Sequence, residues 1–177
     1  MDIPAREVWQ RGPLPGVPSI LQPVAHALLQ AEEEVQKEMQ AFPEELLWKR
    51  LGGVASVGFH LQHLTGVLDR LFTYALAQPL QQEQLQSLAI EGKESPDIVV
   101  SQLVAAFHGQ VEKAIAQLKN EEETQLLAAR GIGRAQIPTT VLGLYVHAAE
   151  HTMRHVGQLL VTARILKSMT HDQRAID

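Results

Sequence analysis

The chain has 177 residues, of which 45% are hydrophobic and 20% are charged, and its formal net charge is -5. This size and balance predict one folded domain over residues 1–177. An acidic chain without a run of Lys or Arg is not expected to bind nucleic acid. The absence of cysteine excludes disulfides, thiolate nucleophiles, Cys-based zinc fingers and iron–sulfur sites.

The first dozen residues contain several charges and lack the apolar stretch of a signal peptide. No apolar run in the sequence is long enough to cross a bilayer. We therefore expect a cytoplasmic protein that has no membrane partner.

Closely spaced prolines precede the first predicted helix. Prolines at positions 13, 15 and 18 predict an extended lead-in over residues 1–18, because they do not fit a helix. Apolar residues at helical spacing predict a first long helix over residues 20–40 and a second over residues 56–77. A short helical segment that begins at Pro43 lies between them.

The second half of the chain contains two more long helices. Residues 81–95 are polar and Gln-rich, which predicts a long crossover with one helical turn near Leu85. A third helix is expected from Ser95-Pro96-Asp97, with Ser or Asp as its cap, to about Asn120. A connection with two glycines then leads to a fourth helix from Pro138 to about Met169, and a polar tail over residues 170–177.

Four long helices without a convincing strand predict an all-α protein. The expected architecture is a four-helix bundle with a long crossover between its second and third helices. Such bundles can hold metal sites between facing helices.

The segment from His147 to Gln158 carries the chemistry. His147, His151 and His155 recur at every fourth residue, so they form a column on one face of the fourth helix. Two imidazoles one turn apart can bind the same ion. A single pair at this spacing is usually incidental, but three on an apolar helix favour a common partner.

The second cluster lies on the predicted second helix, where His60 and His63 are three residues apart. Either of them can supply a third nitrogen to the column on the fourth helix. Three nitrogens with open positions suit zinc, nickel or ferrous iron, and the residues alone leave both the metal and the choice of ligand open. The alternative is that these histidines only pack or face solvent.

Two further observations limit the chemistry. The residue after His151 is Thr152, so the general-base Glu of the His-Glu-x-x-His metalloproteases is missing. Gln158 lies one turn after His155, where it can hydrogen-bond a ligand or remain an ordinary surface side chain. The residues do not identify a catalytic acid or base.

These motifs resemble the DinB/YfiT-like superfamily. The similarity lies in His151-x-x-x-His155-x-Gly157-Gln158 and in the helix-two segment from Gly58 to Gly66 with the Asp69-Arg70-Leu71 that follows it. It extends loosely from Leu21 to Leu166.

The resemblance implies an up-down-down-up bundle with a divalent metal held by His63, His151 and His155. His60 and His147 are extra, and would orient the ligands or replace one of them. The resemblance also implies a homodimer.

Characterised members of this family include transferases and isomerases that use a low-molecular-weight thiol. We therefore expect a metal-dependent transferase that joins such a thiol to a small electrophile. The alternatives are a non-catalytic metal-binding or stress-associated bundle, and a structural bundle whose histidines only pack.

Overall fold

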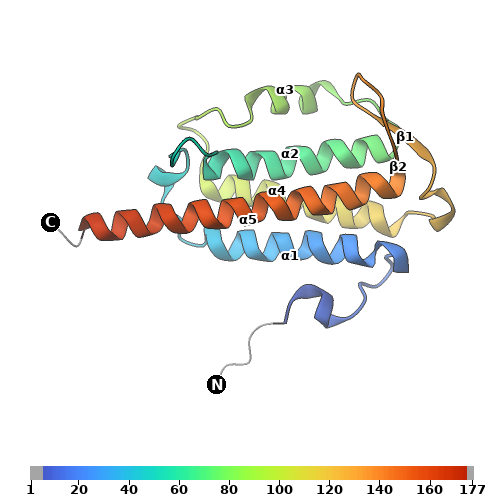
Figure 1. Ribbon diagram of the computed structural model, residues 1–177, viewed down its shortest axis with the longest axis horizontal. Coiled ribbons are helices and arrows are strands. Elements are labelled where there is room, and N and C mark those ends of the chain that lie inside the picture. The colour runs from blue at the N-terminus through green and yellow to red at the C-terminus, as the bar shows by residue number, and fades with distance from the viewer. Residues whose placement is uncertain (1–5, 175–177) are drawn as a thin grey trace.

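The computed structural model describes residues 6–174, and most of them are helical, which confirms the all-α prediction (Figure 1). Among the described residues the longer elements are α1 Gln22–Met39, α2 Val57–Ala75, α3 Gln82–Ile90, α4 Val100–Lys119, β1 Ala129–Ile132, β2 Ile137–Thr140 and α5 Val141–Arg174. Short 3-10 turns lie at Val8–Arg11, Ser19–Leu21, Glu44–Leu46 and Glu123–Gln125.

The four long helices pack around one core. Both α4 and α5 lie against α1 and α2, and the shorter α3 lies on α2. Figure 1 shows α1 and α5 running in one direction and α2 and α4 in the other. Leu28, Leu64, Val111 and Leu144, one from each long helix, are completely buried in the same cluster. Apolar burial of this kind is the main force that holds such helices together.

The beginning of α2 is fixed by a local cap. The Ser56 hydroxyl accepts a hydrogen bond from the backbone N–H of Phe59 at 3.2 Å, which satisfies one of the unpaired donors of the first turn. This cap fixes the residue at which α2, the helix that carries His60 and His63, begins.

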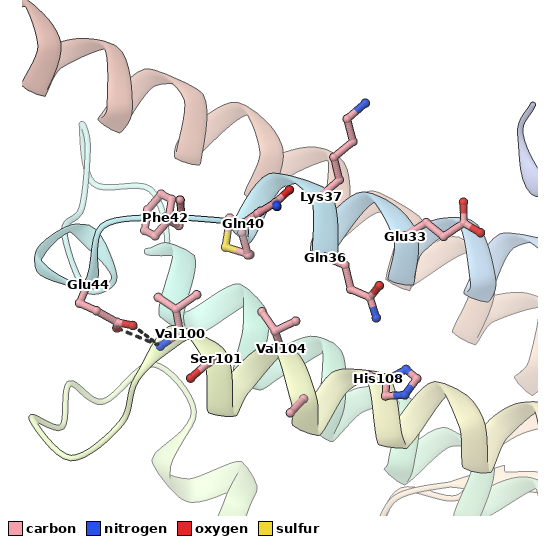
Figure 2. Close-up of a pocket in the computed structure, with 13 residues that line it drawn as sticks. Glu33, Gln36, Lys37, Gln40, Phe42, Glu44, Val100, Ser101, Val104 and His108 are labelled. Carbon is pink, nitrogen blue, oxygen red and sulfur yellow. Dashed lines mark hydrogen bonds between the residues drawn. The ribbon is translucent and has the colours of Figure 1, made fainter. Parts of the chain in front are cut away.

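The beginning of α4 differs from the prediction. Neither Ser95 nor Asp97 caps it, because the helix begins later, at Val100. The carboxylate of Glu44, from the turn after α1, accepts the backbone N–H of Val100 at 2.9 Å (Figure 2). A negative charge at a helix N-terminus is favourable. A partner 56 residues away in the chain cannot be recognised from local sequence.

Two elements were not expected from the sequence. The crossover contains a full helix, α3, in place of one turn, and none of its residues is buried. Its leucines, Leu85 and Leu88, remain exposed, and a segment this short and polar gives no clear helical periodicity. The connection before α5 forms an antiparallel hairpin in which Gly131 pairs with Pro138. Glycine and proline normally interrupt strands, and proline is tolerated here because β2 is an edge strand.

The ends of the chain also depart from the prediction. The lead-in contains the 3-10 turn Val8–Arg11, so it is not uniformly extended. The backbone of α5 continues through the first part of the expected tail, to Arg174, and begins at Val141 instead of Pro138. Residues 1–5 and 175–177 lie outside the described residues.

Within residues 6–174, no helix combines the length and the apolar character needed to cross a bilayer.

Leu28 provides a test of the core. Its side chain is 0% exposed, so Leu28→Ala should lower the free energy of unfolding by about 2–5 kcal/mol through lost burial and a residual cavity. Leu88→Ala, on α3 and 45% exposed, is the matched control and should change it little. Urea denaturation of both variants measures the difference, and equal effects would contradict the assigned core.

Candidate metal centre

Three of the predicted ligands meet where α2 packs against α5. His63 lies on α2, and His151 and His155 lie one turn apart on α5. One ring nitrogen from each lies within 4.8 Å of the other two. All three residues are only partly buried, so the cluster is accessible from outside the core.

The distances within the cluster suit one ion. His63 Nε2 lies 2.9 Å from His151 Nε2, and the His155 ring centroid lies 4.4 Å from that of His63 and 4.5 Å from that of His151. Two nitrogens that are each 2.0–2.1 Å from one ion and subtend a right angle are about 2.9 Å apart. The His63–His151 pair therefore has the spacing of two ligands in adjacent coordination positions.

The second nitrogen of His63 is held by an acidic residue that the sequence did not indicate. His63 Nδ1 lies 2.8 Å from Glu91 Oε2, at the end of α3. An ionised carboxylate only accepts, so Nδ1 carries the proton and the Nε2 lone pair points to the cluster. This carboxylate–imidazole arrangement fixes the tautomer of many metal-binding histidines.

Glu91 is itself held by a cation. Arg70 Nη1 donates to Glu91 Oε1 at 2.6 Å, and the two side chains are about nine-tenths buried. The partner of Arg70 lies in the crossover, and no sequence pattern there links Glu91 to α2.

Two glycines let the crossover approach α2 closely. A Cβ at Gly66 would lie 2.5 Å from Glu91 Oε1, inside any normal contact. Gly92 has φ +77°, and a Cβ there would lie 2.8 Å from the Phe59 ring. Only glycine combines that backbone conformation with so close an approach. Both glycines therefore support the position of Glu91 beside His63.

His60 is buried beneath the cluster and touches one of its members. It is 3% exposed, and its Nδ1 lies 3.1 Å from His155 Nδ1. One of these nitrogens donates and the other accepts. When His155 donates, its Nε2 lone pair is free for a metal and His60 acts as the acceptor that orients the ring.

Burial favours the uncharged form of these imidazoles. Burial, helped by the nearby His63, lowers the pKa of His60 to about 4. The same two causes, burial first, lower the pKa of His155 to about 4 and also lower the pKa of His151. At neutral pH these three rings are uncharged, which is the form that binds metal ions.

The carboxylate of Glu91 remains ionised. Burial alone would raise its pKa, but hydrogen bonds from His63 and Arg70 outweigh burial and lower the pKa below its ordinary value. The carboxylate can therefore hold the His63 proton at neutral pH.

One nitrogen in the cluster is buried without a partner. Among the described residues, His151 Nδ1 is one of two buried side-chain polar atoms that make no hydrogen bond. An unpaired buried nitrogen is costly. A metal ion held through Nε2 of His151, the nitrogen that faces His63, would leave Nδ1 unpaired, so the fit of the cluster to a metal ion rests on its three converging imidazole nitrogens.

The other two predicted residues on α5, His147 and Gln158, are exposed and lie outside the three-histidine cluster. The His147 side chain is 49% exposed and lies 3.9 Å from Glu150, with its ring centroid 5.4 Å from that of His151. The column is therefore partly buried at His151 and His155 and open to solvent at His147. Gln158 is also exposed. It lines a cavity of about 760 Å³ together with His60, Arg154 and the 51–55 loop.

Comparison with known proteins places this arrangement in a family. A family model described as the DinB superfamily matches residues 27–159. The chain therefore belongs to the DinB superfamily, as the sequence resemblance predicted. No curated protein gives a significant match.

Solved structures share the fold. A conserved protein from Enterococcus faecalis superimposes with a TM-score of 0.65 at 17% identity, over 84% of this chain and 97% of that one. A protein from Streptococcus pneumoniae gives a TM-score of 0.59 at 15% identity, over 82% and 88% of the two chains.

The support of His63 by Glu91 leads to a prediction. Glu91→Gln should weaken divalent-metal binding about 10–100-fold, because the neutral amide no longer fixes the His63 tautomer or raises its basicity. Glu94→Gln, an exposed neighbour, is the matched control. Competition titration with a chromogenic chelator measures both affinities, and an unchanged affinity in Glu91→Gln would show that the contact is incidental.

Proposed function

We propose that this chain binds one divalent metal ion through His63, His151 and His155. The observation that carries the proposal is the meeting of three imidazole nitrogens within 4.8 Å. The lowered pKa values of His151 and His155 and the Glu91 contact to His63 support it. Neutral nitrogen ligands suit zinc, nickel or ferrous iron.

The proposed fold around the site is a four-helix bundle with an up-down-down-up order and α3 in its crossover. It is supported by the contacts of α4 and α5 with both α1 and α2 and by the helix directions in Figure 1. We also propose a homodimer. Its support is the apolar surface of α5, where Val161 and Ile165 are 58% and 46% exposed.

The function that we propose is transfer of a low-molecular-weight thiol to a small electrophile. A bound divalent ion supplies a Lewis acid, which lowers the pKa of a thiol and makes it a better nucleophile. In such a transfer the sulfur forms a bond to the electrophilic carbon, the leaving group departs with its bonding electrons, and the thiol proton passes to solvent. The family resemblance and the donor set support this reaction class.

The chain's own residues would orient the metal ligands and offer space for a substrate. Glu91 holds the proton on His63 Nδ1, and His60 holds the ring of His155. The cavity of about 760 Å³ beside His60 has the size of a small-molecule site. Its walls include the exposed apolar side chains of Val54 and Val161, which suit the apolar part of an electrophile.

A non-catalytic metal-binding bundle is the second candidate. The observation that favours it is that Glu91, the carboxylate that contacts the cluster, has both oxygens engaged by His63 and Arg70 and is not available to transfer a proton. A protein that only holds a metal needs no proton-transfer group.

Metal content tests the binding proposal. Purified protein loaded with zinc, nickel or ferrous iron should retain about one ion per chain after extensive dialysis. His151→Ala should lose most of it, because one of three ligands is removed. His147→Ala, on the same helix and 49% exposed, should retain it. Retention of the ion by His151→Ala would overturn the ligand set.

Thiol-conjugation assays test the reaction. The metal-loaded protein should accelerate conjugation of at least one thiol, among glutathione, bacillithiol, mycothiol, coenzyme A and cysteine, with a panel of small electrophiles. The metal-depleted protein should be inactive. Stoichiometric metal without conjugation would contradict the transferase and favour the non-catalytic bundle.

A further inference from the structure

A second cavity lies apart from the metal ligands, between α2, α3 and α4. Its volume is about 270 Å³, which is smaller than the roughly 300–1,000 Å³ of sites for drug-sized ligands. Its walls carry polar side chains, among them Asp69, Arg70, Gln84, Gln110 and Lys113, together with apolar ones such as Ile90 and Leu103. A cavity of this size with charged and amide groups on its walls suits a small metabolite that carries polar groups.

Gln110 is the feature that points to a ligand. Its side chain lines the cavity and the residue is only 7% exposed. Within residues 6–174, it makes no hydrogen bond to any protein group. Its amide atoms are not among the fully buried unpaired polar atoms of the described residues, so they reach the open space of the cavity, where a polar group of a ligand would hydrogen-bond to them. The amide can both donate and accept.

Arg70 presents unused donors to the same cavity. Its guanidinium carries five N–H donors, and its one hydrogen bond to a described residue is the Nη1 contact to Glu91. The remaining donors suit a carboxylate, which a guanidinium can bind through two parallel hydrogen bonds.

The other charges of the cavity are of opposite sign. Lys113, at the exposed side of the cavity, forms no ion pair with any described residue. Asp69 uses one oxygen, Oδ2, to accept a hydrogen bond from Gln84 at 2.7 Å, and its other oxygen is unused. With Glu91 balancing Arg70, the lining is close to neutral overall. Such a lining favours a molecule that carries one positive and one negative group over a simple anion or cation.

The cover of the cavity is held by polar contacts. No residue of α3 is buried, and the helix is tied to α2 by Gln84, which donates to Asp69 and to Thr73 at 2.8 Å, and by Glu91. Segments with few buried apolar contacts open at low free-energy cost. Opening of α3 would therefore give a ligand access without disturbing the core.

We propose that this cavity binds a small zwitterion of the amino-acid type. Its carboxylate pairs with Arg70 and Gln110, and its ammonium group with the free oxygen of Asp69. Lys113 at the rim attracts the carboxylate end. The site does not depend on the bound metal, although Glu91 belongs both to its wall and to the support of His63.

The proposal can be tested with the full chain by titration calorimetry and thermal shift. The probes are the common L-amino acids and, for each one that binds, two matched analogues, the carboxylic acid without the amino group and the amine without the carboxylate. At least one amino acid should bind and raise the melting temperature. Each half-analogue should bind about tenfold more weakly or worse, because it lacks one charged contact.

Variants assign the site. Gln110→Leu should abolish the thermal shift by the amino acid while leaving the ligand-free protein as stable or more stable, since an unpartnered amide is replaced by an apolar side chain of similar size. Asp69→Asn should weaken binding of the amino acid about tenfold but leave that of its des-amino analogue unchanged. Lys119→Met is the control. Lys119 lies on α4, like Gln110, but outside the cavity, so amino-acid binding should not change.

The proposal is overturned if no amino acid binds, if a half-analogue binds as tightly as the parent, or if Gln110→Leu retains the full thermal shift.

Discussion

The packing of α2 against α5 is the contact on which the candidate centre depends. His63 and His151 are 88 residues apart in the chain and are joined only because the apolar faces of these helices share the core. Leu64 and Leu68 on α2, and Leu144 and Leu159 on α5, are fully buried. Their burial is the main source of stability at this contact. It places three imidazoles together at the edge of the core, where they are partly shielded from water.

A cluster of imidazoles at the edge of the core has an energetic cost. The histidines raise the cost of charging one another, and burial adds to this cost. Glu91 and Arg70 add an ion pair that is itself about nine-tenths buried. Buried ion pairs and unpaired nitrogens contribute little stability and can reduce it. We therefore interpret the cluster as a feature retained for binding, with α3 in place to deliver Glu91 to His63.

The long helices were predictable from the sequence because each of them buries an apolar stripe with the helical period. The positions of His151 and His155 followed from the same periodicity, and the family resemblance singled out His63 over His60. Glu91, α3 and the Glu44 cap of α4 were not predictable. Each depends on polar contacts between segments far apart in the chain, and a polar residue in a connection has no pattern that identifies its partner.

The two halves of the proposal differ in what supports them. The metal site is supported by distances between nitrogens, by their lowered pKa values and by the DinB superfamily match over residues 27–159. The thiol-transfer reaction is supported by the family resemblance and by a cavity of suitable size beside His60. The location of the ion is therefore the central claim, since the reaction has no site without it.

Anomalous diffraction from crystals of the metal-loaded protein, recorded on both sides of the absorption edge of that metal, tests this claim most directly. We expect one strong anomalous peak per chain, at about 2.0–2.1 Å from one nitrogen of each of His63, His151 and His155. A peak coordinated by His60 or His147 in place of one of these residues, or no peak between α2 and α5, would contradict it.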